Sequence, residues 1–124
     1  MATPEQTPLQ TPLQTREQQR AQRAYQQVEK HRDKEREAED KRFCKRFPAL
    51  IQSCGLVQAI AFAQAKLREY LDDLAAVMEQ ENQETLAQQA RTAPLAQYQK
   101  HSRDALSAAT WLKRYAEALL KGDD

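Results

Sequence analysis

The longest apolar stretch of the chain covers residues 47–66, FPALIQSCGLVQAIAFAQAK, and the rest of the sequence is strongly polar. Over residues 56–65 only Gln58 and Gln64 interrupt the apolar side chains. A helix that is apolar on nearly every side is one that other helices surround. The stretch is too short and too interrupted to cross a bilayer, which needs about 20 apolar residues. The pattern therefore predicts the central helix of a small bundle and no membrane partner.

Two residues in this stretch carry signals for helix ends. Proline is common in the first turn of a helix, because its missing N–H would have no partner there. Glycine commonly follows a helix, because it adopts the left-handed conformation that closes the last turn. Pro48 and Gly55 therefore predict a short helix over residues 48–54, a turn at Gly55 and a buried helix from Leu56 onward.

The segment after Leu56 continues the helical pattern as far as Gln80. Its apolar residues recur at spacings of three and four, with neither proline nor glycine among them. This pattern fits one helix, or two helices with a break between Lys66 and Arg68. A weaker helical segment follows, and Pro94 ends it and starts the next.

The last helix is the best defined by its pattern. Its apolar face repeats at spacings of three and four without a slip, and Gly122 lies just beyond it as a stop signal. Trp111 and Tyr115 widen this face, so Trp111 is expected in the core or against a partner. The repeating positions are Leu95, Tyr98, Ser102, Ala105, Ala109, Leu112, Ala116 and Leu119.

The segment before Pro48 predicts one long first helix. Thr15 suits the N-cap position. The first residue after it that should avoid helical geometry is the one that precedes Pro48. This allows about 31 residues, or roughly 46 Å. Residues 31–40 contain only Ala38 as an apolar residue, so this part is either solvated or meets another macromolecule. Charge pairs at helical spacing would hold it: Glu29 with Arg32, Asp33 with Arg36, and Glu37 with Lys41.

The composition is that of an all-helical protein. The 124 residues include only two Gly and five Pro, and a sheet protein needs more turn residues than that. The length suits one domain. We therefore expect an all-α fold: a small single-domain helical bundle of about five to six helices, with a long first and a long last helix, over residues 15–124.

Residues 1–14 differ from the rest, because they contain a tandem TPLQ repeat and no residues for a core. This composition predicts a flexible Thr/Pro/Gln-rich tail. No apolar segment of the kind found in signal peptides occurs there, so a cytoplasmic location is expected.

The charges are distributed unevenly. The net charge is +1, yet basic groups concentrate toward the two ends of the sequence. Lys41, Arg42, Lys45 and Arg46 fall on one arc of a helical wheel, opposite the apolar arc of the same helix. One or two cations would suffice to complement the helix dipole. Four of them also predict a patch that contacts phosphates.

A second basic stripe lies on the last helix. Lys100, Arg103 and Arg114 share the face opposite its apolar residues. A solvated face is the simpler explanation of this stripe, and a second phosphate-contacting patch is the alternative that stays open beside it.

The sequence contains no motif for catalysis or metal binding. His31 and His101 are far apart, and neither is expected beside a carboxylate pair in an apolar setting. No HExxH, CxxC or Gly-rich phosphate loop occurs. Asp72 and Asp73 are adjacent, so on a helix they point about 100° apart and cannot share a metal. We therefore expect no catalytic residue, no metal, no cofactor and no small-molecule substrate.

Cys44 and Cys54 are ten residues apart, a spacing that matches no metal or redox motif. Two buried, reduced thiols near helix ends are the simplest interpretation, and a disulfide is left open.

Two stretches together resemble a known family. The first is residues 47–66, and the second is YQKHSRDALSAATWLKRYAEALL, residues 98–120. They are similar to the small helical subunit of the type III-B CRISPR ribonucleoprotein, the Cmr RNA-silencing complex. That family pairs a Pro-initiated segment leading to Gly-Leu with a terminal helix carrying Trp-Leu-Lys-Arg. Here these features are Pro48, Gly55–Leu56 and Trp111–Arg114, and the resemblance covers about residues 16 to 121.

The resemblance implies a non-catalytic subunit of an effector complex. Several copies would pack beside the backbone subunits that hold the guide RNA and would help to form the groove for the target strand. The partners it implies are other subunits of the complex, copies of this chain and target RNA, with guide RNA as a further candidate.

Two other functions remain open at this point. One is a protein-only helical adaptor with no direct RNA contact, in which the charged helix and the apolar stripes only dock partners. The other is a helix-turn-helix DNA-binding protein, which is less favoured because the helix after Gly55 is too apolar to lie in a groove.

Overall fold

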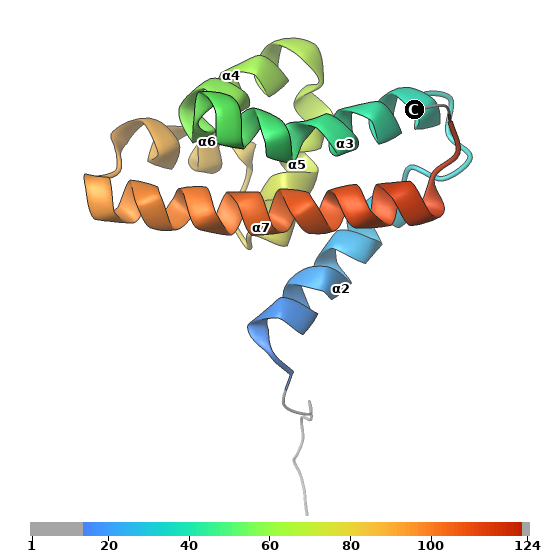
Figure 1. The fold of residues 1–124 in the computed structure, drawn as a ribbon, viewed down its shortest axis with the longest axis horizontal. Coiled ribbons are helices and arrows are strands. Elements are labelled where there is room, and N and C mark those ends of the chain that lie inside the picture. Colours follow the sequence, from blue (N-terminus) through green and yellow to red (C-terminus); the bar gives the residue numbers. More distant parts are fainter. Residues whose placement is uncertain (1–13, 123–124) are drawn as a thin grey trace, which may run out of the picture.

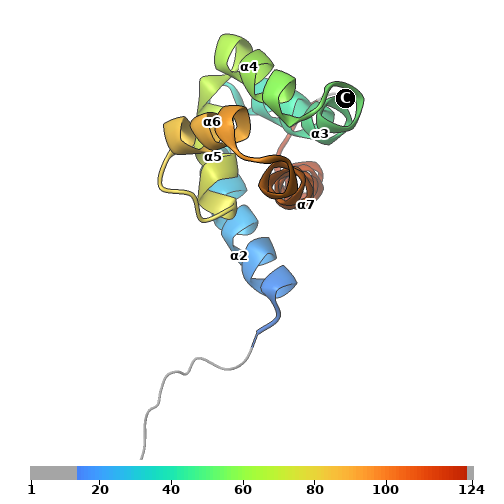
Figure 2. The ribbon, with the colours of Figure 1, turned by 90° about the vertical axis from the view of Figure 1, so that its left-hand side faces the viewer.

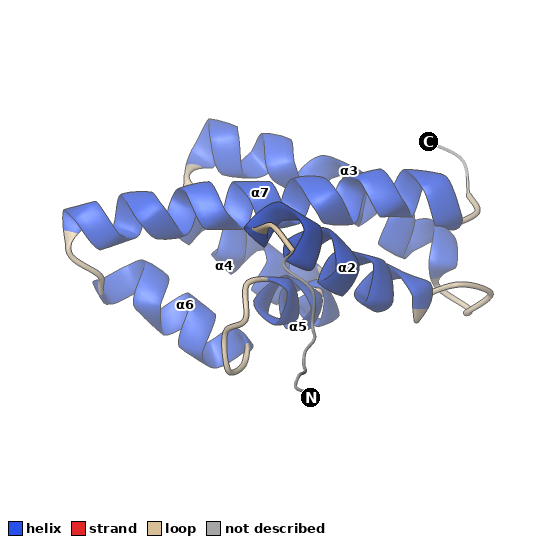
Figure 3. Ribbon diagram, turned by 90° about the horizontal axis from the view of Figure 1, so that it is seen from below, coloured by secondary structure: helices blue, strands red, loops and turns tan. Residues whose placement is uncertain are grey.

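The computed structural model describes residues 14–122, and every regular element in that range is an α-helix (Figures 1 and 3). This confirms the all-helical bundle of five to six helices with a long last helix. Apart from Gln14, the predicted tail lies outside the described residues. The helices are α2 (Arg16–Glu29), α3 (Glu37–Cys54), α4 (Leu56–Lys66), α5 (Arg68–Val77), α6 (Gln83–Thr92) and α7 (Leu95–Leu119).

Helix α7 runs antiparallel to α3 along its length (Figure 1). Beyond the C-terminal end of α7, the backbone N–H of Lys121 donates to Oε2 of Glu37 at the start of α3, at 3.0 Å. At the other end, the Tyr98 hydroxyl lies 3.3 Å from the backbone nitrogen of Val57, which donates to it just after α3. The view along α7 in Figure 2 shows α3 and α4 on one side of α7, with α5 and α6 beside them and α2 below.

The core has two different parts. Along α7 the buried face consists largely of alanines around Leu112, and such small side chains allow neighbouring helices to approach closely. Between α3, α4 and α5 the core is aromatic instead. Phe43 and Phe47 of α3 lie with ring centroids 5.8 Å apart, and Tyr70 of α5 lies 4.6 Å from Phe47. Phe47 is completely buried and Tyr70 nearly so.

The prediction of one long first helix is wrong. Helix α2 ends at Glu29 after 14 residues, and the chain turns through residues 30–36, where Asp33 has a φ of 60°. Residues 32–36 carry no apolar side chain, so nothing there would anchor a continuous helix to the core. The turn lets α2 and α3 pack separately against α7.

The charge pairs predicted for a continuous helix are only partly present. Arg32 does pair with Glu29, at 3.3 Å. Arg36, however, pairs with Glu39, and Asp33 pairs with Lys121 beyond α7. The predicted Asp33–Arg36 pair is therefore wrong, because both residues lie in the turn, where helical spacing does not apply.

Pro48 does not start a helix as predicted, because α3 passes through it. An internal proline removes one backbone hydrogen bond and costs about 3 kcal/mol. The buried face of α3 continues across it from Phe43 and Phe47 to Ile51, and this packing favours a helix that does not stop. The predicted turn at Gly55 is present, with a φ of 84° between α3 and α4.

The segment from Leu56 to Gln80 forms two helices. The break falls at Leu67, whose φ of −157° and ψ of 79° are not helical. The predicted central helix is only partly central. Helix α4 buries Leu56 and Ile60, but Val57 and Ala61 are exposed, so one side of this helix faces solvent.

The helix ends follow local chemistry. Thr15 is the N-cap of α2 as predicted: its hydroxyl accepts from the Gln18 backbone at 2.9 Å, and its own backbone donates to the Gln18 side chain at 2.8 Å. Leu95, predicted as part of the apolar face of α7, is 72% exposed, because it lies in the first turn beyond the core. None of the helices within residues 14–122 combines the length and apolar character that a membrane span requires.

Candidate nucleic-acid interface

The four predicted cations of α3 divide into two pairs. Arg42 and Arg46 are exposed, whereas Lys41 and Lys45 are half-buried. The Lys41 ammonium donates to the backbone carbonyl of Gly122 at 3.3 Å, which ties α3 to the segment after α7. The two arginines are therefore the members of this patch that face solvent most fully.

Arg42 and Arg46 border an open cavity of about 490 Å³ between α3 and α4. Lys66, in the last turn of α4, adds a third cation to its lining. The full lining is Glu39, Arg42, Phe43, Arg46, Phe62, Lys66 and Leu67. The local sequence gives no signal for Lys66, because it joins the arginines only through the pairing of α3 with α4.

Aromatic rings form part of this lining. The Arg46 guanidinium carbon lies 5.5 Å from the centroid of the Phe62 ring, a distance at which a cation is attracted to the ring. Phe62 in turn stacks on Phe43, with centroids 6.0 Å apart and planes 9° apart. The cationic rim is thus supported by aromatic side chains that the core holds in place.

One carboxylate, that of Glu39, lines the same cavity. The Arg36 Nε donates to it at 2.9 Å, and this hydrogen bond lowers the pKa of Glu39 below its ordinary value. Because its charge is offset by Arg36, the cavity keeps an excess of positive charge from Arg42, Arg46 and Lys66.

The second predicted patch is not a single cluster. Lys100 pairs with Asp104 on its own helix at 3.0 Å, and Asp104 also pairs with Arg20 of α2 at 3.5 Å. Arg103 and Arg114 are exposed, but they are eleven residues apart, or about 16 Å along α7. Lys100 is therefore partly neutralised, and the two arginines act as separate charges.

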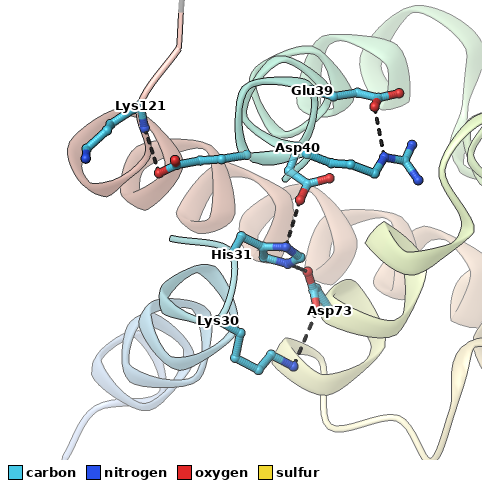
Figure 4. Close-up of polar contacts among 8 residues, drawn as sticks. Lys30, His31, Glu39, Asp40, Asp73 and Lys121 are labelled. Carbon is cyan, nitrogen blue, oxygen red and sulfur yellow. Dashed lines mark hydrogen bonds and ion pairs between the residues drawn. The ribbon is translucent and has the colours of Figure 1, made fainter. Parts of the chain in front are cut away.

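His31 occupies a position that sequence reasoning missed. The expectation that no carboxylate pair lies beside it is wrong (Figure 4). Its Nδ1 lies 2.9 Å from Asp40 of α3, and its Nε2 lies 2.7 Å from Asp73 of α5. Lys30 approaches Asp73 at 3.8 Å from the other side. No local motif could have revealed this cluster, since its members lie on separate segments.

The two carboxylates hold His31 in its charged form. Hydrogen bonds to Asp40 and then to Asp73 raise the pKa of His31 to about 10, against an opposing effect of burial. At neutral pH both ring nitrogens therefore carry protons and donate them. In this state the imidazole can neither accept a proton nor ligate a metal, so the geometry gives His31 a structural role.

The two adjacent carboxylates of α5 point in different directions, as their helical spacing predicts. Asp73 is buried and Asp72 is exposed. Across residues 14–122, no group of three or more His, Cys, Asp or Glu side chains is arranged to hold a metal ion.

The two cysteines are both free thiols, but they are not both buried. Cys44 is buried in α3, where desolvation raises the pKa of its thiol well above the ordinary value. Cys54 is exposed at the end of the same helix. The prediction of two buried thiols is therefore wrong for Cys54, because the turn at Gly55 leaves the last residue of α3 on the surface.

A row of aromatic side chains lies where α2 meets α7. Trp111 and Tyr115 stack with centroids 5.7 Å apart, and Tyr25 meets Tyr115 edge-on at 5.5 Å. Trp111 is half-buried against the core, and Tyr25 is 39% exposed. The expectation that Trp111 belongs to the core or to a partner-facing surface agrees with this half-buried position.

Residues 14–122 define a class of protein: a small helical bundle whose buried charged side chains are engaged in structural contacts, such as those of His31 with Asp40 and Asp73, and whose other charged groups lie toward the surface. The sequence profile described as CRISPR-associated protein (Cas_Cmr5) matches residues 16–119. The chain therefore belongs to the Cmr5 family, the small subunit of the type III-B CRISPR Cmr complex.

Two relatives illustrate the similarity. The CRISPR system Cmr subunit Cmr5 of Thermus thermophilus is 39% identical over 80 residues, which cover 61% of this chain and 70% of that protein. The crystal structure of a CRISPR-associated Cmr5 family protein from Thermus thermophilus superposes with a TM-score of 0.84 at 35% identity. This match covers 88% of the present chain and 100% of the other.

Proposed function

We propose that this chain is a non-catalytic subunit that packs in several copies beside the guide-RNA backbone subunits, in the cytoplasm, and helps to bind the target RNA strand. The assignment to this complex rests on membership of the Cmr5 family. The RNA contact rests on one observation: Arg42 and Arg46 are exposed on consecutive turns of α3 and share a cavity with Lys66. Cations arranged in this way bind a phosphate backbone without reading its sequence.

The other predicted cations take supporting places in this proposal. Lys41 and Lys45 lie on the same helix and add positive potential beside the arginines. Arg103 and Arg114 are exposed along α7 and form a second, more widely spaced contact, to which Lys100 contributes less because Asp104 pairs with it.

A protein-only adaptor is the alternative, and a specific feature favours it. Tyr25 is 39% exposed and meets Tyr115, which stacks on Trp111, so neighbouring aromatic side chains form one surface where α2 meets α7. A contiguous apolar surface of this kind suits docking of a neighbouring subunit. In this alternative the basic residues would serve only solubility and pairing between proteins.

The two functions are separated by target binding to the assembled complex. The informative variant is Arg42→Glu combined with Arg46→Glu. The control is Lys34→Glu with Arg91→Glu, which makes the same change in charge at two other exposed positions. We expect the first variant to weaken binding to unrelated target RNAs by a similar factor, because phosphate contacts are sequence-independent. We expect the control to bind like wild type.

Equal affinity of both variants in a complex that assembles normally would favour the adaptor. Helix content measured by circular dichroism should be unchanged in each variant, because all four positions are exposed.

A further inference from the structure

The cavity between α3 and α4 has more structure than a group of surface cations. Arg42 and Arg46 approach it from α3, and Lys66 approaches it from α4. Its volume of about 490 Å³ falls within the range of about 300–1,000 Å³ that is usual for pockets that bind small molecules. A cavity of this size accommodates a single unit of a polymer, not only an ion.

The aromatic part of the lining is packed against the core. Phe62 is packed on Phe43, and Phe43 is packed on Phe47 and Tyr70 in the core. Arg46 lies over the Phe62 ring, which gives the cavity a guanidinium and a phenyl ring as neighbouring flat surfaces. Single-stranded bases stack on both kinds of surface, and such stacking tolerates any base.

The charge of the cavity complements a phosphate. Three cations line it, and its one carboxylate, Glu39, is engaged by Arg36. The carboxylates of an acidic peptide would also pair with these cations, but they would make no stacking contact with Arg46 and Phe62. The combination of cations with a flat stacking surface therefore favours a nucleotide.

We propose that this cavity is a subsite for one nucleotide of a single RNA strand, with its phosphate held by Arg42 and Lys66 and its base stacked against Arg46 and Phe62. This inference rests on the proposed function, because it names the place where the strand makes its closest contact. It adds Phe62 to the interface and gives Lys66 a specific phosphate contact, and neither residue belongs to the predicted basic patches.

The test uses the assembled complex and a series of target RNAs that each lack one base. With wild type, we expect reduced affinity when the abasic position lies over the cavity, because a stacking contact is lost there. Phe62→Leu keeps an apolar side chain but no ring, and full-length target should bind to this variant at least about five-fold more weakly than to wild type. Abasic positions over the cavity should then cause no further loss. Phe62→Tyr keeps the ring and should bind like wild type.

Lys66 is tested in the same assay. Lys66→Gln should reduce the slope of log K against log salt by about 0.7, the contribution of one phosphate on a single strand. Lys66→Arg keeps the charge and should restore the slope.

Two outcomes would overturn the subsite. One is that no abasic position lowers the affinity for target RNA and that Phe62→Leu binds with the affinity of wild type, while Arg42→Glu with Arg46→Glu still weakens RNA binding. The proposed function would then stand without the subsite. The other is loss of complex assembly in Phe62→Leu and Lys66→Gln with RNA affinity unchanged, which would assign the cavity to an acidic protein partner. If the double arginine variant itself binds RNA normally, the proposed function fails, and the subsite fails with it.

Discussion

Nε2 of His31 donates a hydrogen bond to Asp73, 42 residues further along the chain, at 2.7 Å. The other ring nitrogen contacts Asp40 of α3 at 2.9 Å. One imidazolium ring therefore connects the turn after α2 to both α3 and α5 (Figure 4). This cluster holds the turn that sequence analysis interpreted as the middle of a long helix.

The charged His31 makes the stability of the fold depend on pH. Its pKa is raised from 6.5 to about 10 by the hydrogen bonds to Asp40 and Asp73. A pKa raised by folding contributes stability that is fully present below pH 6.5 and is lost as the pH rises through 10. The free energy of unfolding should therefore fall between about pH 6.5 and 8.5, by up to about 1.4 kcal/mol per pH unit.

The measurement is urea unfolding at a series of pH values, with His31→Gln as the control. The variant cannot be charged and should show a flatter profile over this range. The buried Cys44 thiol also has a raised pKa, but its effect begins only near pH 9.0, the ordinary pKa of a thiol, so the chosen window excludes it. Parallel profiles in wild type and His31→Gln would contradict the assigned role of the imidazole.

The neighbouring carboxylates of α5 offer a matched pair of variants. Asp73→Asn leaves the charged His31 with only Asp40 as an ionic partner, and breaking a buried pair costs about 3 kcal/mol. Asp72→Asn changes an exposed residue one position away and should stay within about 0.5 kcal/mol of wild type. Thermal or urea unfolding measures both. Equal effects of the two variants would show that the His31 cluster adds no specific stability.

Gly55 is the residue that allows α3 to turn directly into α4. Its φ of 84° and ψ of 162° belong to a region that is essentially restricted to glycine and costs about 1–3 kcal/mol for other residues. A Cβ there would meet only the Tyr98 hydroxyl, at an ordinary 3.6 Å, so backbone strain is the cause and crowding is not. Gly55→Ala should reduce the free energy of unfolding by this amount, as measured by urea unfolding.

Gln52→Ala, at an exposed helical position in the last turn of α3, is the control and should leave the stability nearly unchanged. If Gly55→Ala is as stable as this control, the turn between α3 and α4 differs from the one described.

The two cysteines should react at very different rates. Cys54 is exposed and Cys44 is buried, and only a thiolate that reagents can reach is modified quickly. A water-soluble maleimide should label one thiol in the native protein and two after denaturation. Cys54→Ser should remove the fast reaction, whereas rapid labelling that survives in this variant would place Cys44 at the surface.

The features that could be predicted from the sequence are those encoded over a few residues. The apolar repeat of α7 can be recognised in the sequence because α7 packs against other helices along most of its length. Thr15 and Gly55 determine only the backbone of the turns in which they lie. The break after Glu29 and the continuation of α3 through Pro48 depend on packing between segments. Local signals favour a helix that continues past Glu29 and a new helix that starts at Pro48, and neither is present.

The same limit applies to the candidate interface. Arg42 and Arg46 are four residues apart in the sequence, so their shared face is predictable from helical spacing. Lys66 and Phe62 join them only because α4 folds back along α3. The His31 cluster is equally non-local, and its absence from the sequence-based interpretation has the same cause.

The central claim is that the exposed arginines of α3 bind the phosphates of the target strand. It is tested most directly by the salt dependence of target affinity for complexes carrying wild type or Arg42→Glu with Arg46→Glu. Each phosphate contact on a single strand contributes roughly 0.7 to the slope of log K against log salt, so the variant should have a slope smaller by about 1.4. Lys34→Glu with Arg91→Glu should keep the wild-type slope. An unchanged slope and affinity in the arginine variant, with normal assembly, would contradict the RNA contact.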